Sequence, residues 1–496
     1  GYSMVIDNAE DLDGLPDEEI RQAALLAESE GEEGKWVFKP TRVSMYPFLT
    51  YATQRDLREE LYNSYIQRGD NDNEFDNKAI IAKMIGLRKE KAALMGFDSH
   101  SEYVLDNTMA KTPENVNELL NTIWEPGIEK AKDEVKALQD LISSEGGNFK
   151  LAAWDWWHYS EKLRQEKFDF KEEEVKPYFS EDKVLQGAFE VANKLFDITF
   201  EESADLPKYR DNIKTFIVKD KSEKTIGIFY TDYTLRPNKG GGAWMSTFRD
   251  QSKFDGEIIP LVINVCNFPP ENADGVSLLS FEQVETLFHE FGHGLHGLLS
   301  EAQYPSLSGT SVTRDYVEFP SQMMENWARE PEVIKTFAQH YQTGETIPDE
   351  LLEKISAAGT FNEGFATTEY VAAAHLDMAY HTNLDEIKDI DKFEDNALSD
   401  LGLIPEIESR YRSTYFGHIF AGGYSSGYYS YLWTEVLEAD AFEAFKEKGL
   451  FDKDTADKLK KYVYSSGNTD DLMTQYVRFR GKEPVIEPLL KKRGLN

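Results

Sequence analysis

The sequence predicts a mostly helical protein that contains one small β-sheet. Apolar residues recur at intervals of three and four, the spacing of one helical face, in residues 54–68, 80–95, 113–143, 181–195 and 349–374. Between these stretches, short runs rich in Ile, Val and Phe alternate with charged or glycine-rich turns, a pattern typical of strands. The expected strands are residues 215–220, 227–232 and 261–268, with an edge strand at residues 243–245 after the glycine-rich run 239–242.

Composition restricts the partners of the chain. Its 496 residues include 54 Lys and Arg against 90 Asp and Glu, a formal net charge of −36. Nucleic acid phosphates and anionic membranes both favour basic surfaces, so this excess argues against either partner. No apolar run approaches the roughly 20 residues that cross a bilayer. The single cysteine, Cys266, excludes an internal disulfide framework and fits a reducing compartment, so we expect a cytoplasmic protein.

The strongest functional signal is Phe288-His289-Glu290-Phe291-Gly292-His293. Two His four positions apart share one helical face, where both imidazoles can bind one zinc ion and the adjacent Glu can act as general base. An apolar stripe on the same segment consists of Val284, Leu287, Phe288, Phe291, Leu295 and Leu298. His289, His293 and His296 lie on the opposite side. The pattern predicts a helix that packs into a core and lines a cleft.

Three glycines interrupt this helix, Gly292, Gly294 and Gly297. Each costs about 1 kcal/mol relative to Ala in a helix interior. We expect close approach by another backbone or by substrate to offset that cost.

A catalytic zinc ion takes three protein ligands and leaves one position for water. Residues 309–327 follow the His pair and contain three candidates for the third ligand, Asp315, Glu318 and Glu325. Glu318 and Glu325 are seven positions apart and would share a helical face. Pro320 favours a first helical turn, which places Glu318 near a helix start or at a kink. Spacing alone does not choose among the three carboxylates.

These motifs resemble the thimet-oligopeptidase family of zinc peptidases, and within it the bacterial peptidyl-dipeptidases. The family signature H-E-F-G-H-x-x-H matches residues 289–296, and the block G-T-x-V-x-R-D-[FY]-V-E-x-P-S-Q-x-x-E-x-W matches residues 309–327. The first Glu of that block is the family's third zinc ligand, which implies Glu318. We expect Glu325 and His296 to be supporting residues behind the ligands rather than ligands themselves.

The resemblance extends from about residue 35 to residue 496. Residues 238–245 are similar to the family's substrate-flanking strand, which implies peptide binding by Ala243, Trp244 and Met245. Residues 416–433 are similar to its Gly- and Tyr-rich segment, which implies oxyanion donors at Tyr424, Tyr428 and Tyr431, with His418 nearby. The alternative for the tyrosines and for Trp244 is packing in the core.

The resemblance further implies a two-lobed helical enzyme with a deep channel, a small sheet at the channel wall and one zinc ion per chain. We expect residues 35–496 to form the catalytic region, with lobes that are not contiguous in sequence. Residues 1–34 would be the remnant of a helical region whose upstream part is absent. Acidic and small residues in the stretch 10–35 suggest a loosely attached helix or linker there.

The implied partners are short unfolded peptides, with a monomer favoured. The favoured activity is that of a peptidyl-dipeptidase, which releases dipeptides from the C-terminus. An oligopeptidase that cleaves internal bonds is the alternative. A non-catalytic, zinc-stabilised peptide-binding protein is a third hypothesis, but it gives Glu290 no function.

Overall fold

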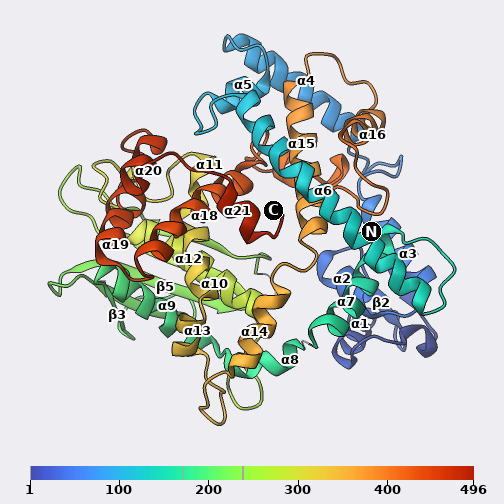
Figure 1. The fold of residues 1–496 in the computed structure, drawn as a ribbon, viewed down its shortest axis with the longest axis horizontal. Helices are drawn as coiled ribbons and strands as arrows, with labels where there is room; N and C mark the ends of the chain where they lie inside the picture. Colours follow the sequence, from blue (N-terminus) through green and yellow to red (C-terminus); the bar gives the residue numbers. More distant parts are fainter. Residues whose placement is uncertain (1, 170, 237–238) are drawn as a thin grey trace.

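A computed structural model of the chain describes residues 2–169, 171–236 and 239–496. Residue 1 of the predicted N-terminal remnant and residue 238 of the predicted substrate strand lie outside this described part. Helices dominate the fold, and two groups of helices form two lobes (Figure 1). The predicted class, mostly helical with a small sheet, is confirmed. The channel between the lobes stays a prediction.

The first lobe, on the left of Figure 1, contains a five-stranded sheet of order β3-β4-β5-β7-β6. The strands are β3 (Thr199–Glu202), β4 (Lys214–Lys219), β5 (Thr225–Thr234), β7 (Leu261–Phe268) and β6 (Trp244–Arg249). β5 and β7 run parallel, and the other neighbours are antiparallel. The three predicted apolar runs form β4, β5 and β7, and the predicted edge strand forms β6. Sequence reasoning missed β3, which is polar and mostly exposed.

Helices pack against this sheet around one hydrophobic core. The core contains Phe229 and Val262 of the sheet, Phe291 of α10 and Met323 of α12. The helices of the lobe are α9 (Glu181–Phe196), α10 (Phe281–Leu298), α11 (Arg314–Val317), α12 (Phe319–Arg329), α13 (Pro331–Phe337), α14 (Asp349–Ala358), α19 (Lys453–Leu459) and α20 (Leu472–Arg480). α10 therefore lies between the sheet and α12.

The second lobe, on the right and at the top of Figure 1, has separate cores of its own. Its helices are α1 (Asp17–Glu30), α2 (Arg42–Tyr51), α3 (Arg55–Ile66), α4 (Lys78–Leu94), α5 (His100–Leu105), α6 (Pro113–Ser144), α7 (Trp156–Phe168), α15 (Glu363–Thr382), α16 (Ile390–Leu401) and α17 (Gly417–Phe420). β1 (Met4–Ile6) pairs with β2 (Trp36–Phe38). The short helix α8 (Glu172–Val175) follows α7 along the chain.

One long helix, α18 (Ser430–Lys448), joins the two lobes. Its Leu437 and Phe442 lie in the core of the first lobe, and its Leu432 and Ala439 lie in a core of the second. The C-terminal helix α21 (Glu487–Lys492) packs beside it. Within the described residues, no helix is both long enough and apolar enough to span a membrane.

The predicted continuous helix over residues 349–374 is wrong. Residues 359–362 separate α14 from α15, and Asn362 adopts a left-handed φ of 61°. Asn tolerates that conformation better than most residues, so the chain can turn sharply here although its apolar spacing continues. In the N-terminal segment, α1 forms and buries Ala23 and Ala27, so the helix alternative holds there and the linker alternative is wrong.

Gly292 is a point of close backbone contact between α10 and α12. A Cβ at Gly292 would lie 2.6 Å from Ser321 Cα and 2.7 Å from the carbonyl oxygen of Pro320. The close approach of another backbone, expected from the sequence, is confirmed at this position. The other two helix glycines instead face side chains of the sheet: a Cβ at Gly294 would meet Phe229 and Asn264, and one at Gly297 would meet Met245 and Val262.

We expect Gly292→Ala to lower the free energy of unfolding by about 1–3 kcal/mol, because the added methyl would force α10 away from α12. Gly86→Ala in α4 is the matched control, since no atom lies within 4 Å of its Cβ position. That variant should gain up to about 1 kcal/mol from helix propensity. Chemical denaturation of both variants measures the difference, and equal stabilities would contradict the close contact.

Candidate active site

Helix α10 buries its apolar stripe and directs two imidazoles to the other side. A capping box fixes its start: Ser280 Oγ accepts the N–H of Gln283 at 3.1 Å, and Gln283 Oε1 accepts the N–H of Ser280 at 2.9 Å. The predicted stripe is confirmed, since all six of its residues are buried. The rings of His289 and His293 lie on the opposite face, with centroids 4.9 Å apart.

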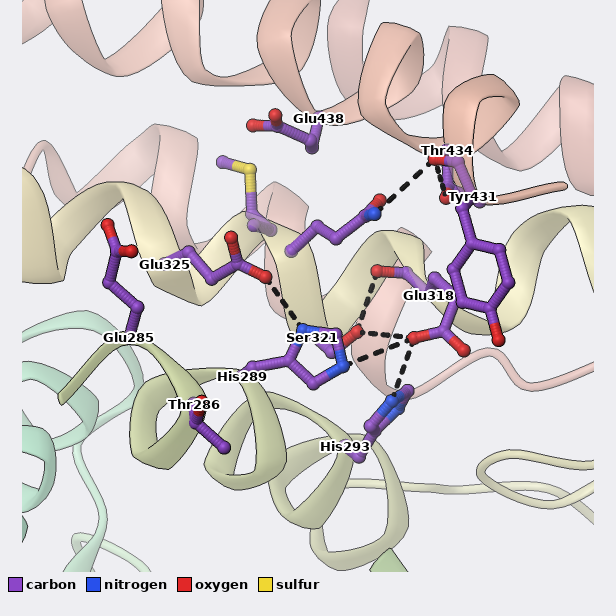
Figure 2. A network of polar contacts seen from close by, with 12 residues as sticks. Glu285, Thr286, His289, His293, Glu318, Ser321, Glu325, Tyr431, Thr434 and Glu438 are labelled. Carbon is purple, nitrogen blue, oxygen red and sulfur yellow. Dashed lines mark hydrogen bonds and ion pairs between the residues drawn. The ribbon is translucent and has the colours of Figure 1, made fainter. Parts of the chain in front are cut away.

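Three candidate ligand atoms converge between α10 and α12 (Figure 2). His289 Nε2 lies 3.2 Å and His293 Nε2 lies 3.0 Å from Glu318 Oε2. All three ligand atoms lie within 4.8 Å of one another. The side chains of His289 and His293 remain 24% and 11% exposed, so the group is not sealed from solvent.

The position of Glu318 depends on a break between two helices. It stands between α11 and α12, and Pro320 occupies the first turn of α12, so the kink anticipated from the sequence is present. Ser321 Oγ donates to the backbone oxygen of Glu318 at 2.7 Å and to its Oε2 at 3.3 Å. Ser321 was missed by sequence reasoning, because its place in the motif does not reveal which atom its hydroxyl contacts.

Glu325 contacts the far side of the first imidazole. Its Oε1 lies 2.7 Å from His289 Nδ1, and Figure 2 shows Glu325 and Glu318 on opposite sides of that ring. A proton on Nδ1 therefore donates to Glu325, and Nε2 of the same ring faces Glu318.

Asp315 has different partners altogether. It is buried and accepts the N–H groups of Met109 at 3.0 Å and Ala110 at 2.9 Å. It also accepts the hydroxyl of Tyr429 at 2.8 Å, and Tyr429 is itself buried in the core. The fold thus separates the three carboxylates that spacing could not distinguish, and only Glu318 faces both imidazoles.

The two carboxylates beside the imidazoles have opposite pKa shifts. Burial opposes ionisation of Glu318, but the charge of His293 and hydrogen bonds from both His residues hold its pKa well below the usual value. Burial raises the pKa of Glu290, and the nearby His charges offset only part of that rise. Such a contrast is typical of one carboxylate that binds a cation and another that exchanges a proton.

The donor set fits one divalent transition-metal ion. Two imidazole nitrogens and a carboxylate oxygen match the ligand chemistry of such ions, and a second carboxylate already orients one imidazole. Glu290 is only 4% exposed, and its Oε2 has no hydrogen-bond partner among the described residues. A buried unpaired carboxylate oxygen is costly, and a water molecule beside it would satisfy it.

His296 does not share the exposed face of His289 and His293. It is buried beside Tyr316 and Tyr464, with ring centroids 6.4 Å away in both cases. Neither of its ring nitrogens has a hydrogen-bond partner among the described residues, and burial lowers its pKa to about 3. The expectation of three His on a cleft-lining face is therefore wrong at His296, because neighbouring segments cover that part of α10. Its supporting role for the ligands stays a prediction.

The predicted tyrosine segment forms a cluster of rings. His418 packs against Tyr424 and Tyr428, with centroids 5.7 and 5.2 Å away. Tyr431 stacks on Tyr424 at 5.4 Å with an interplanar angle of 13°. Figure 2 shows the ring of Tyr431 beside Glu318. Burial raises the pKa of Tyr431, and Tyr424 and Glu318 add to the rise.

Two further contacts of the tyrosine segment were not anticipated. Gln322 Nε2 donates to the backbone oxygen of Tyr431 at 3.3 Å, which connects α12 to the start of α18. The guanidinium of Arg314 lies 4.4 Å from the ring centroid of Tyr424. Both Arg314 and Gln322 belong to the matched block, but spacing within the block does not show what they contact.

β6 forms an open edge of the sheet. Ala243 directly precedes the strand, and Trp244 and Met245 are its first two residues. Trp244 is 38% exposed, so the alternative that it packs in the core is wrong. Met245 packs towards α10 at Gly297. In the described part of the chain β6 pairs only with β7, which leaves one row of backbone groups available to an extended peptide.

Comparisons with known proteins agree with this geometry. The model of Peptidase family M3 matches residues 48–495. The dipeptidyl carboxypeptidase of Escherichia coli is 39% identical over 498 residues, covering 99% of this chain and 73% of that protein. Oligopeptidase A of Haemophilus influenzae is 34% identical over 505 residues, covering 100% of this chain and 74% of that protein.

A solved structure shares the fold. The Pyrococcus furiosus carboxypeptidase superposes with a TM-score of 0.50 at 14% identity, over 97% of this chain and 80% of that one. The fold, the convergent ligand group and the match over nearly the whole sequence lead to one conclusion. This chain belongs to Peptidase family M3 and is a metallopeptidase.

Proposed function

We propose that this chain is a zinc-dependent peptidyl-dipeptidase, which releases dipeptides from the C-terminus of short unfolded peptides. The observation that carries the proposal is the convergence of His289 Nε2, His293 Nε2 and Glu318 Oε2 near the buried carboxylate of Glu290. The similarity to dipeptidyl carboxypeptidases supports the type of cleavage. We favour a monomer with one zinc ion.

His289, His293 and Glu318 would hold the zinc ion. When bound, zinc polarises a carbonyl and lowers the pKa of water to about 7. Glu290 accepts the proton of the attacking water at its unpaired Oε2 and then delivers it to the leaving amine. A raised pKa suits the second step, because a more basic carboxylate holds the proton until the amine departs. Glu325 keeps His289 in the orientation that the site needs.

The phenol groups of the ring cluster would stabilise the oxyanion. Tyr431 is best placed, since its ring lies beside Glu318, while Tyr424 and Tyr428 pack around it with His418. Such preorganised donors act on charge that develops only in the transition state. Along the wall, β6 at Ala243, Trp244 and Met245 would pair with the peptide backbone, which permits broad sequence specificity.

Two other functions, one catalytic and one non-catalytic, differ from this proposal in testable ways. An oligopeptidase that cuts internal bonds would use the same metal site, and the similarity to oligopeptidase A favours it as the second candidate. A non-catalytic peptide-binding protein would need the ligands alone. The burial of Glu290 with an unpaired oxygen argues against a non-catalytic protein, because a purely structural metal site does not need a buried carboxylate without a hydrogen-bond partner.

Glu290→Gln should retain zinc and lower kcat by at least about 10²-fold, because the variant keeps the shape of the side chain and loses the proton acceptor. His293→Ala should lose both zinc and activity, because it removes a ligand. Metal analysis of the purified variants, combined with hydrolysis of a fluorogenic peptide, separates the two effects. Normal turnover by Glu290→Gln would show that another group is the base.

The type of cleavage depends on a free C-terminal carboxylate. With a nonapeptide as substrate, we expect sequential loss of C-terminal dipeptides, and amidation of the C-terminus should reduce the rate at least about tenfold, the value of one lost charge-assisted contact. Mass spectrometry of the products, with and without a chelator, measures both. Internal cleavage that persists on the amidated peptide would instead identify an oligopeptidase.

A further inference from the structure

A buried carboxylate from the second lobe holds the backbone of the tyrosine segment. Asp377 lies on α15 and is fully buried. Its Oδ1 accepts the N–H of Ser426 at 2.8 Å, and its Oδ2 accepts the N–H groups of Gly427 and Tyr428, each at 2.9 Å. Ser426 adopts a left-handed φ of 54°, which helps to turn the three successive N–H groups towards one anion.

His381 and Arg88 hold Asp377 in place. His381 Nδ1 lies 2.8 Å from Asp377 Oδ1, and its Nε2 lies 2.9 Å from Arg88 NH1. A guanidinium only donates, so Nε2 is the acceptor and the ring proton resides on Nδ1, facing Asp377. Arg88 NH2 also donates to the backbone oxygen of Ile419 at 2.7 Å, next to His418. These three side chains therefore bind the tyrosine segment at two places, residues 426–428 and the backbone oxygen of Ile419.

Side chains of α5 hold the same turn. Ser101 Oγ lies 2.5 Å from Ser426 Oγ, and His100 Nε2 lies 3.0 Å from Ser425 Oγ. By contrast, Ala421, Gly422 and Gly423 are exposed. Within the tyrosine segment, residues 421–423 are therefore exposed, whereas residues 425–428 are fixed by hydrogen bonds to side chains of α5 and α15. Tyr428 is the last of these fixed residues, and Tyr431 follows within the first turn of α18.

Burying a carboxylate is costly, and here the three amides and one imidazole compensate for it. These hydrogen bonds stabilise the folded turn whether or not they affect catalysis. The location of the carboxylate also affects the tyrosines. Tyr428 is the last of the three residues whose backbone N–H binds Asp377, and its ring packs against that of Tyr431 with centroids 6.0 Å apart. A shift of the turn would move the phenol of Tyr428, and through it the neighbouring ring of Tyr431, relative to Glu318, which lies in the other lobe.

We propose that Asp377 is a positioning residue for peptide hydrolysis. By fixing residues 426–428 it places the hydroxyls of Tyr428 and Tyr431 against the developing oxyanion. This inference rests on the proposed function, in which those tyrosines are the oxyanion donors. Displacing such a donor by about 1 Å can cost 10²-fold in rate while substrate binding changes little.

Asp377→Asn tests the inference. The Asn side chain has an N–H₂ group in place of one carboxylate oxygen, and this group cannot accept hydrogen bonds from the backbone N–H groups that bind Asp377. We expect kcat to fall about 10- to 100-fold, KM to change less than about threefold and the zinc content to stay the same. Glu134→Gln is the matched control: Glu134 accepts the N–H groups of Gly364 at 3.0 Å and Phe365 at 2.8 Å in the same lobe, away from the tyrosines. Its kcat should stay within about twofold. A fall in kcat of the control equal to that of Asp377→Asn would overturn the inference.

A double-mutant cycle separates positioning from a merely structural effect. In a Tyr428→Phe, Tyr431→Phe background, Asp377→Asn should change kcat by less than about threefold, because the two hydroxyls that Asp377 is proposed to position are already absent. A full additional loss in that background would overturn the inference and leave the role of the tyrosines intact. If the two Phe substitutions alone left kcat unchanged, the tyrosines would not be oxyanion donors and the proposed function would fail at that point.

If Asp377→Asn does not fold, as judged by circular dichroism, His381→Phe replaces it in the same cycle. Phe keeps an aromatic ring and removes the contacts of both ring nitrogens with Asp377 and Arg88. The expected fall in kcat is about 3- to 10-fold, because the carboxylate remains but loses its orientation. Full additivity with the Phe substitutions would overturn the inference in this case too.

Discussion

The contact between the backbones of α10 and α12 at Gly292 is the constraint on which the metal site depends. Helical periodicity alone brings His289 and His293 together, since four residues make about one turn. No local rule brings Glu318 to them. It reaches the imidazoles only because α12 lies directly against α10 where a side chain is missing. A substitution that separates these helices therefore acts on the ligand geometry as well as on packing.

The carboxylates of this protein act differently because their neighbours differ. Glu318 meets two imidazoles and stays ionised, whereas Glu290 lacks such partners and its pKa rises. Glu325 accepts a hydrogen bond from the imidazole of His289, a candidate ligand. Asp377 accepts hydrogen bonds from three backbone N–H groups of the tyrosine segment. The chemistry of each carboxylate thus follows from which groups the fold places around it.

The sequence predicted the features that depend on neighbours along the chain. The His pair, the apolar stripe of α10 and most of the strands follow from periodicity, and the resemblance implied Glu318 as the third ligand. Features that depend on distant packing were missed or wrong, such as the burial of His296 and the grip of Asp377 on residues 426–428. Nothing in the spacing of α15 shows which backbone its Asp377 faces. The break at Asn362 was missed although its residue type permits a turn.

The open edge of β6 carries a liability along with its proposed use. A strand that can receive an extended peptide can equally receive the same strand of a second molecule, and Trp244 and Phe248 stand exposed on it. Like charge keeps such molecules apart, and a net charge of −36 supplies it. Mutual repulsion of the acidic surfaces therefore protects an edge that must stay uncovered, and added salt, which screens that repulsion, weakens this protection against self-association.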